Sequence, residues 1–287
     1  MHVVPTPLLN CPHDGSTLLQ RSQSLVCPAG HTFDRAREGY VNLLPVQDKA
    51  SLDPGDNKLM VAARHRFLET SAYAPIAAAV AGKTIELIGT AISRPFTILD
   101  AGCGEGYYLQ ALASALAADA DPAIIQLAGI DISKWAVRAA ARRPVPATWV
   151  VASNRRPPLP PASTDLILCL FGFPLWTGFA SIQPPAGHVL LVDPGPDHLL
   201  QLRAIIYPEV RINERTPTPN TDAYAPVSES RVRASAHLAS SQVIADLLSM
   251  TPHAHRATVE GRAALAARSS LDITIDVILR VFRRQAI

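Results

Sequence analysis

Charged residues, cysteines and long apolar runs are all scarce in this sequence of 287 residues. Charged side chains make up 17% of the chain and the net charge is only +2, which excludes a strongly basic surface that binds nucleic acid by charge alone. RNA contacts must then come from shape or from local arginines such as Arg64, Arg66 and Arg280, each of which is alternatively a solvated surface residue.

Membrane and export signals are also missing. The longest apolar run, around residues 166–176, is interrupted by Gly172 and Pro174, and it is shorter than the roughly 20 residues that a transmembrane helix needs. The amino terminus lacks a basic start followed by an apolar segment and a cleavage site. These absences predict a cytoplasmic protein with no membrane partner.

Four cysteines are too few for a disulfide framework in a chain of this length. Cys103 and Cys169 lie in apolar segments, and we expect both to be small buried residues. The other two cysteines belong to a short pattern near the amino terminus, in which Cys-Pro-His-Asp is followed after twelve residues by Cys-Pro-Ala-Gly-His.

This pattern is typical of a zinc ribbon except at one position, where an aspartate stands in place of a cysteine. The candidate ligands are Cys11, Asp14, Cys27 and His31. Two interpretations remain open. In the first, zinc is held with an oxygen of Asp14, or with a nitrogen of His13 in its place. In the second, the ribbon holds metal weakly or not at all, and apolar packing by residues 33–44 supports it.

Length and composition predict a small N-terminal unit followed by a larger α/β domain. Residues 48–58 are polar and contain Pro-Gly, which indicates a linker or a mobile loop. We therefore divide the chain into a ribbon at 1–47, a linker with helices at 48–90, and a catalytic domain at 91–287.

Alternating apolar strands and amphipathic helices fill the larger domain and predict a parallel sheet covered on both faces. The expected strands are 96–101, 126–131, 147–152, 164–171, 187–193 and a reversed last strand at 272–282, in a sheet of about seven strands. The expected helices are 59–68, 74–88, 106–117, 134–142 and 241–250, and residues 213–226 are expected to form a loop over the cleft.

The first of these strands leads into the pattern Asp100-x-Gly102-x-Gly104-x-Gly106 and then into a helix. Such a loop lets the backbone approach a ligand closely and presents free N–H groups at the start of the helix. Asp131 ends the next strand, where a carboxylate can accept hydrogen bonds from both hydroxyls of a ribose. Ser153 follows the third strand at the same edge of the sheet.

This glycine spacing is similar to the first motif of class I methyltransferases that use S-adenosylmethionine (AdoMet), whose fold is a Rossmann-like α/β sheet. More specific segments resemble one family of these enzymes, the bacterial guanine-N1 methyltransferases of 23S ribosomal RNA. They are the ribbon at 11–34, the run Glu38–Gln47, the Asp53–Asp56 turn, the Pro194–Leu199 segment and Met250–Pro252.

The resemblance implies a homodimeric enzyme that uses AdoMet to methylate a guanine in a hairpin loop of 23S rRNA, with the ribbon helping to hold the RNA. It also implies that Tyr73 borders the cofactor, that Gly104 and Glu105 contact its amino-acid portion, and that His198 lines the pocket near the transfer site. Two alternatives are a methyltransferase that acts on a small molecule and a protein that binds AdoMet and RNA without transfer.

Guanine N1 carries a proton at neutral pH, so that methylation needs a proton acceptor. His198 and Asp193 are the candidates. Alternatively His198 only makes hydrogen bonds, which we favour, and Asp193 only caps a turn. Phe171, Phe173 and Trp176 are candidates for stacking on an extruded base, although for Phe171 we favour a place in the core.

Overall fold

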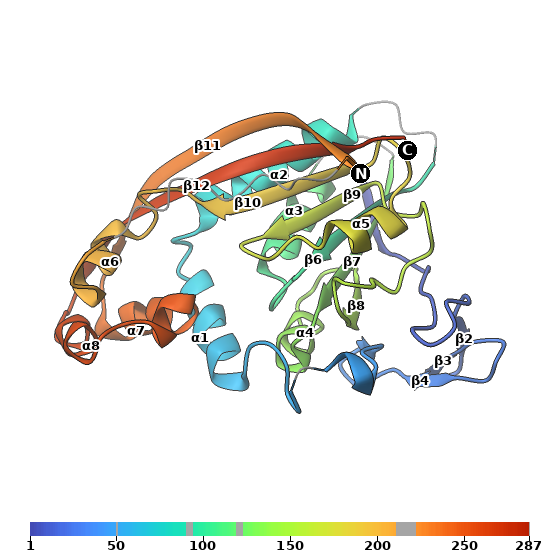
Figure 1. Cartoon of the computed structure of the whole chain (residues 1–287), viewed down its shortest axis with the longest axis horizontal. Helices are drawn as coiled ribbons and strands as arrows, with labels where there is room; N and C mark the ends of the chain where they lie inside the picture. Colours follow the sequence, from blue (N-terminus) through green and yellow to red (C-terminus); the bar gives the residue numbers. More distant parts are fainter. Residues whose placement is uncertain (50, 90–93, 119–122, 211–221, 287) are drawn as a thin grey trace.

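A mixed β-sheet forms the centre of the molecule in the computed structural model, which describes residues 1–49, 51–89, 94–118, 123–210 and 222–286 (Figure 1). Its strands are β1 (His2–Pro5), β5 (Val41–Asn42), β6 (Phe96–Ala101), β7 (Ile124–Asp131), β8 (Thr148–Val151), β9 (Leu166–Leu170), β10 (His188–Pro194), β11 (Tyr224–Leu238) and β12 (Leu271–Arg284). The strand order is β11-β12-β10-β9-β6-β7-β8-β5, and β1 pairs with β7.

The strand directions confirm a parallel sheet with a reversed last strand. From β10 to β5 every neighbouring pair is parallel, and β1 is parallel to β7. The long strand β12 runs antiparallel to β10 and to β11. All six strands that the sequence predicted are present, with ends that differ by a few residues.

The central sheet contains nine strands among the described residues, against the sheet of about seven strands that the sequence predicted. The first two of the unpredicted strands, β1 and β5, are four and two residues long and come from the segment assigned to the ribbon. The third, β11, is an edge strand whose side chains are mostly exposed from Val227 to Arg231, so that it lacks an apolar face to reveal it. The predicted loop at 213–226 lies in part outside the described residues, and its last part begins β11.

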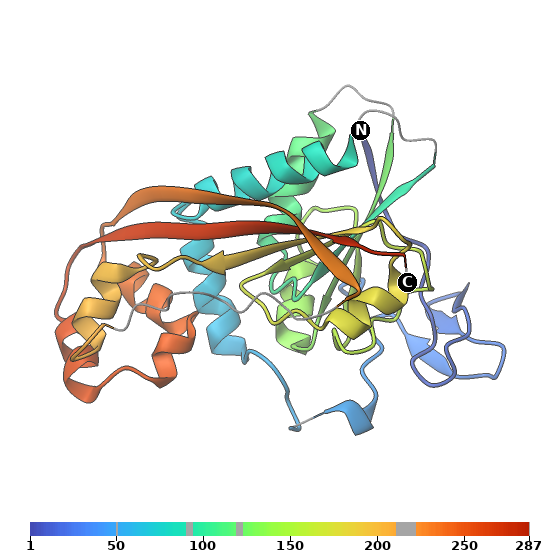
Figure 2. The ribbon, with the colours of Figure 1, turned by 45° about the horizontal axis from the view of Figure 1, so that its top comes forward.

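Helices cover both faces of the sheet and extend beyond one end of it (Figure 2). They are α1 (Lys58–Leu68), α2 (Ala74–Ile88), α3 (Tyr107–Ala117), α4 (Lys134–Ala140), α5 (Trp176–Ile182), α6 (Leu200–Ile206), α7 (Ser241–Ser249) and α8 (Val259–Ala266), with short 3-10 turns at Val46–Asp48 and Pro252–His255. Among the described residues, no helix has the length and apolar character that crossing a membrane requires.

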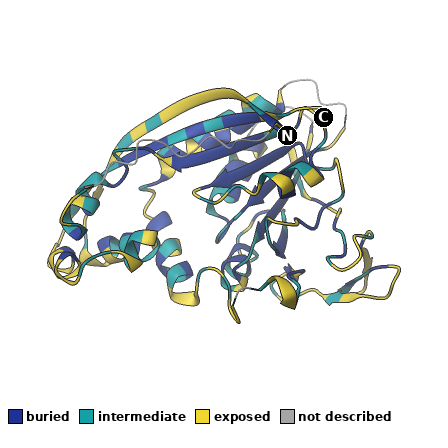
Figure 3. Cartoon of the chain, in the orientation of Figure 1, coloured by how far each residue is buried: buried dark blue, intermediate teal, exposed yellow. Residues whose placement is uncertain are grey.

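Two hydrophobic clusters lie on opposite faces of the sheet, whose central strands are buried (Figure 3). Along β10, Leu190 and Val192 pack with helices α2 and α3 on one face, whereas Val189 and Leu191 pack with α5 on the other. This alternation follows from the two-residue repeat of a strand, and it explains why the central strands carry apolar residues on both faces.

The ribbon contributes a second sheet of three antiparallel strands, β2 (Leu19–Arg21), β3 (Ser24–Val26) and β4 (Thr32–Asp34). It is tied to the loop that follows β8. The backbone N–H of Asn10 donates to the Pro158 carbonyl at 2.9 Å, and Arg156 Nη2 donates to the Pro12 carbonyl at 3.0 Å. The ribbon therefore packs on the side of the sheet that carries α5.

Candidate active site

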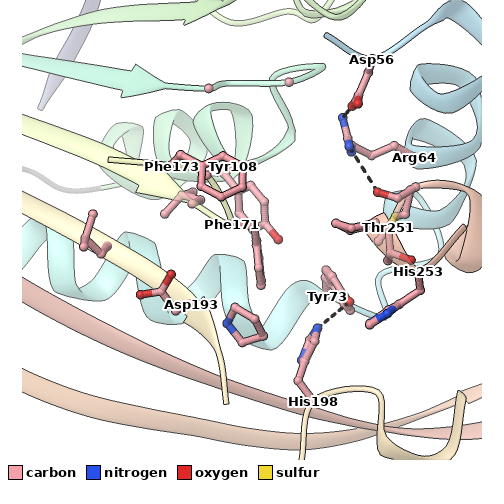
Figure 4. Close-up of a pocket in the computed structure, with 18 of the residues that line it drawn as sticks. Asp56, Arg64, Tyr73, Tyr108, Phe171, Phe173, Asp193, His198, Thr251 and His253 are labelled. Carbon is pink, nitrogen blue, oxygen red and sulfur yellow. Dashed lines mark hydrogen bonds and ion pairs between the residues drawn. The ribbon is translucent and has the colours of Figure 1, made fainter. Parts of the chain in front are cut away.

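A cavity of about 1210 Å³ lies at the carboxyl ends of β6, β7, β9 and β10 (Figure 4). Ligands bind at this edge in open α/β sheets, because the loops that follow the parallel strands meet there. Helix α1 and the segment 250–256 line it as well. The cavity thus combines strand ends, an N-terminal helix and a C-terminal segment.

Three glycines of the loop after β6 have positive φ angles, which are +98° at Gly102, +54° at Gly104 and +82° at Gly106. Gly102 and Gly104 line the cavity, and a Cβ at either position would have no atom closer than 3.6 Å. Gly106 is not part of the cavity wall, because its close neighbours are Trp149 and Ala140. It allows α3 to pack on the sheet.

Two carboxylates, Asp100 and Asp131, face the loop. Asp100 is 1% exposed, and neither of its oxygens has a protein partner among the described residues. Burial, with a further effect of Asp131, raises the pKa of Asp100 to about 8. Asp131 accepts hydrogen bonds from the backbone N–H groups of Gly104 at 3.0 Å and Ser133 at 2.8 Å, and burial raises its pKa too. An acidic, partly unsatisfied wall therefore borders the cavity.

Glu105 lines the cavity, but its carboxylate is directed into a buried ion pair. Oε2 pairs with Arg143 and lies 3.0 Å from His65 Nδ1, whereas Oε1 has no partner among the described residues. Ser153 is absent from the cavity wall, and its hydroxyl accepts from the backbone N–H of Arg155 at 3.2 Å. The structure therefore gives Ser153 a place in a turn.

The segment 48–58, which the sequence assigned to a linker or mobile loop, forms part of the cavity wall. A Cβ at Gly55 would come within 3.0 Å of Ile132 and Ser133, so that the backbone packs directly on the end of β7. The Ser133 hydroxyl donates to the Asp56 carbonyl at 2.6 Å, and Asp56 pairs with Arg64 of α1. This side of the cavity is thus formed by contacts between segments that are far apart in the sequence.

Tyr73 and His198 form a buried pair whose hydrogen bonds define the protonation of the imidazole. The backbone N–H of Asp276 donates to His198 Nδ1 at 3.2 Å, so the neutral ring carries its proton on Nε2. Nε2 lies 3.1 Å from the Tyr73 hydroxyl oxygen and donates to it. Because both ring nitrogens are engaged, this geometry favours hydrogen bonding over proton transfer for His198.

Burial lowers the pKa of His198 to about 4. The folded protein therefore binds a proton here less readily than the unfolded chain, and stability falls as pH drops from about 6.5 to 4. We predict that His198 accounts for a loss of about 3 kcal/mol over this range. In His198→Asn, whose amide oxygen replaces Nδ1 as an acceptor, the free energy of unfolding should depend less on pH. If the difference in the free energy of unfolding between wild type and His198→Asn stays constant from pH 4 to 7, this prediction is wrong.

Aromatic side chains line the cavity between the glycine loop and β10. Phe171 is 37% exposed and has a positive φ of 54°, a strained conformation for a bulky residue. Its ring stacks 6.2 Å from that of Tyr73 and lies 6.4 Å from that of Tyr108. The favoured core position of Phe171 was therefore wrong. Phe173 beside it is 88% exposed and also lines the cavity.

Trp176 reaches the cavity wall but packs mainly in the core of the other face. Its ring lies 4.9 Å from that of Tyr224 and 5.2 Å from that of Phe282. The three aromatic candidates therefore divide into two that offer open ring surface, Phe171 and Phe173, and one that supports the wall.

Asp193 at the end of β10 lines the cavity on the side of Phe171 and Phe173, away from Asp56 and Arg64 (Figure 4). Its Oδ2 lies 3.0 Å from Arg280 Nη1, and both side chains are 12% exposed. Burial raises the pKa of Asp193, and Arg280 opposes that effect. Asp193 is thus a carboxylate with raised proton affinity at the end of the cavity opposite the Asp56–Arg64 pair.

The four predicted metal ligands meet in the ribbon, with one ligand atom of each within 4.8 Å of the others. Cys27 Sγ lies 3.3 Å from both Asp14 Oδ2 and His31 Nδ1, and Cys11 Sγ lies 3.5 Å from His31 Nδ1. Asp14 is oriented by Ser16, whose N–H and hydroxyl both donate to Oδ1, so that Oδ2 faces the cluster. Two sulfurs, one nitrogen and one oxygen suit tetrahedral zinc.

Comparisons with known proteins agree with both parts of the chain. A family model described as "RlmA, N-terminal", a zinc ribbon, matches residues 9–52, and a model of a methyltransferase domain matches residues 98–182. A protein of Micromonospora griseorubida, provisionally named a 23S rRNA (guanine-N(1)-)-methyltransferase, is 31% identical in an alignment that covers all of both chains.

The chain belongs to the family of 23S rRNA (guanine-N1)-methyltransferases.

Two further relatives carry related names. YxjB of Bacillus subtilis (strain 168), provisionally named a 23S rRNA (guanine-N(1)-)-methyltransferase, is 32% identical over 94% of this chain and 95% of its own. The 23S rRNA (guanine(748)-N(1))-methyltransferase of Streptomyces fradiae is 35% identical over 68% of this chain and 66% of its own.

The cavity of this methyltransferase fits its cofactor, AdoMet. The unpartnered Asp100 carboxylate suits the ammonium group of the amino-acid portion, and each oxygen of Asp131 still has a lone pair for a ribose hydroxyl. Gly102 and Gly104 leave room for close approach. We infer that these four residues hold AdoMet, with Tyr73 and His198 at the wall nearby.

Two arginines of the methyltransferase were assigned to local RNA contact or to solvent on sequence, yet both line the cavity. Arg64 lies beside Gly104 and donates to the Met250 carbonyl at 3.3 Å, which joins α1 to the C-terminal segment. Arg280 contacts Asp193. The only sequence signal for the position of Arg280 was the two-residue repeat of β12. This repeat predicts the face of the sheet on which Arg280 lies, but it does not predict which residue of the neighbouring strand Arg280 contacts. Arg66, in contrast, pairs with the buried Asp246.

Zinc in the ribbon of this methyltransferase is open to a direct test. We predict that Asp14→Cys holds zinc about tenfold or more tightly than the wild type, because thiolate is a softer ligand than carboxylate. Asp14→Ala should bind zinc at least about tenfold more weakly than the wild type. Competition with a chelator, followed by elemental analysis, measures both effects, with Asp34→Ala of β4 as the control. Wild-type protein that contains no zinc after metal-replete purification contradicts the prediction.

Proposed function

We propose that this protein transfers the methyl group of AdoMet to N1 of a guanine in a hairpin loop of 23S rRNA. Family membership supports the reaction, since the relatives bear that activity in their names. The observation that carries the proposal is the order of the strand ends along one cavity wall. Asp131 and Asp100 lie at the ends of β7 and β6, which we take as the cofactor end, and next to them Phe171 follows β9 and Asp193 lies at the end of β10, which we take as the acceptor end.

When bound, AdoMet supplies a methyl group on a positively charged sulfur. The protein then has to bring the acceptor nitrogen into line with that methyl group, because positioning accounts for most of the rate in such a displacement. Phe171 and Phe173 offer the ring faces on which an unpaired guanine stacks. His198 holds Tyr73 in place beside this platform through its Nε2–H.

Asp193 takes the N1 proton in this proposal. A general base must lie within reach of the proton and must have a suitable pKa. Asp193 lines the acceptor end, and burial makes it a stronger base than an exposed aspartate. His198 is less suited, because its Nδ1 already accepts from the Asp276 N–H and its Nε2 carries hydrogen.

The proposal extends to the setting of the reaction. The ribbon, within residues 1–47, helps to hold the RNA hairpin, and residues 91–287 carry the transfer. The protein acts as a homodimer in the cytoplasm, where ribosomal RNA is modified. Local arginines and the shape of the cleft guide the RNA, since the net charge of the chain is only +2.

The experiment is to incubate the purified protein with unmodified 23S rRNA and AdoMet, digest the RNA, and identify methylated nucleosides by mass spectrometry. We expect 1-methylguanosine as the product, and none without AdoMet. A different methylated nucleoside refutes the assignment of N1. Methylation of small-molecule acceptors, with no product from rRNA, refutes the assignment of RNA as the substrate.

A further inference from the structure

The Asp193–Arg280 ion pair lies in the wall of the cavity, with both side chains on the same face of the sheet. Residue 280 of β12 is opposite Leu191 of β10, two residues before Asp193, so both side chains lie on the same face of the sheet. Arg280 Nη1 contacts Asp193 Oδ2 at 3.0 Å, and its Nε donates to Glu229 Oε2 at 2.9 Å. The pair is largely buried, and yet both residues line the cavity.

These contacts hold the guanidinium without using all of its donors. Guanidinium has five N–H groups in a rigid plane, and among the described residues Nη2 has no hydrogen-bond partner. Asp193 fixes one side of the plane and Glu229 fixes another. The remaining N–H groups of Arg280 therefore lie beside the Asp193 carboxylate, a hydrogen-bond acceptor, in the same wall of the cavity.

An acceptor beside a donor matches one edge of guanine. On that edge the N1–H donor is adjacent to the O6 acceptor, so that the carboxylate faces N1–H while the guanidinium faces O6. Adenine presents the reverse order, with an acceptor at N1 and a donor at N6. The pair therefore fits guanine and opposes adenine in the same orientation, because the adenine groups would meet a like partner at each position.

The chemistry of the reaction also calls for a cation at this place. When the N1–H bond breaks, the proton passes to Asp193 and the electron pair left on N1 is shared with O6. The N1 pair then forms the bond to the methyl carbon, while the carbon–sulfur bond breaks and the sulfur keeps its electrons. Negative charge thus develops at O6 before methylation neutralises the base, and a fixed donor there lowers the barrier.

We propose that Arg280 is a catalytic residue, which donates a hydrogen bond to O6 of the target guanine, stabilises the charge formed there, and with Asp193 selects guanine over adenine. This inference rests on the proposed function. It goes further by assigning the recognition of the base to one ion pair and the stabilisation of its anion to one side chain.

Single-turnover methyl transfer to unmodified 23S rRNA at saturating AdoMet, from pH 6 to 9.5, tests the proposal. Arg280→Met is expected to be about 10²-fold slower than wild type at neutral pH, the loss typical for removal of one such donor. The deficit should shrink as pH rises, because guanine then ionises at N1 without help. Arg280→Lys, which keeps the charge but not the planar donor set, should lie between the two.

The other titratable groups near the pair are Glu229 on β11 and Cys169 on β9. Burial raises the pKa of the Cys169 thiol to about 12, so that it stays neutral throughout the test. The matched control is Arg283→Met, on the same strand but exposed and outside the cavity wall. It should stay within about twofold of wild type, as exposed changes usually do.

Three outcomes overturn the inference and can be told apart. If Arg280→Met transfers methyl groups as fast as wild type, Arg280 has no role in the reaction. If its rate falls by the same factor at every pH together with AdoMet binding by calorimetry, the role is structural; Arg280→Lys answers the same question if Arg280→Met does not fold. If wild-type protein makes no 1-methylguanosine, the proposed function fails and the inference fails with it.

Discussion

Asp193→Asn is expected to lower kcat for methylation of 23S rRNA by about 10²- to 10⁴-fold, the range typical for loss of a general base. Asparagine has nearly the same size and still accepts a hydrogen bond from Arg280, but it cannot take the N1 proton. We infer that AdoMet binds beside Asp100 and Asp131, neither of which shares a hydrogen bond or ion pair with Asp193. The affinity for AdoMet should therefore stay within about twofold of wild type. Steady-state kinetics and calorimetry measure the two effects.

The pH dependence sharpens this test. Burial raises the pKa of Asp193, so that the carboxylate required as a base is lost at a higher pH than for an exposed aspartate. The wild-type rate should fall as pH decreases through that pKa, and this part of the profile should vanish in Asp193→Asn. Asp197→Asn serves as the control, because Asp197 is close in sequence but pairs with Arg231 and Arg233 outside the cavity wall. An unchanged kcat in Asp193→Asn contradicts the assignment.

Phe173→Ala is expected to weaken binding of the RNA substrate by roughly 1–3 kcal/mol, which is about 5- to 150-fold in KM, the range measured for a base stacked on an aromatic ring. Phe173 is 88% exposed in the protein alone, so that its removal should not lower the free energy of unfolding. Phe173→Ala therefore tests RNA binding at this site without a change in the stability of the fold.

Comparison with another exposed apolar residue makes this result specific. Val259→Ala removes a side chain that is 78% exposed at the start of α8 and is not part of the cavity wall, and it should leave KM unchanged. AdoMet affinity should stay the same in both variants. If Phe173→Ala has the wild-type KM for RNA, the stacking platform is not at this position.

Local sequence patterns predicted the elements that carry the cofactor end of the site. Continuous apolar strands with a carboxylate at the end placed Asp131 and Asp193 at one edge of the sheet, because parallel strands all end there. The glycine spacing predicted the turn after β6, and the structure confirms positive φ at Gly102 and Gly104. These signals are local, and they do not depend on which strand pairs with which.

Features that depend on distant contacts could not be predicted in the same way. Gly55 packs on Ile132 and Ser133 across about 77 residues of sequence, which turns a polar, linker-like segment into a cavity wall. The pairing of Arg280 with Asp193 depends on the register between β10 and β12. The positive φ of Phe171 is held by tertiary structure against the preference of a bulky residue.

The most direct test of the central claim is primer extension on 23S rRNA treated with AdoMet and either wild-type protein or Asp193→Asn. Methylation at N1 blocks the base-pairing edge of guanine, so reverse transcriptase stops at the modified nucleotide. We predict one new stop at a guanine in a hairpin loop with wild-type protein, and a stop that is nearly absent with Asp193→Asn. No new stop with fully AdoMet-loaded wild-type protein, or equal stops with both proteins, contradicts the account.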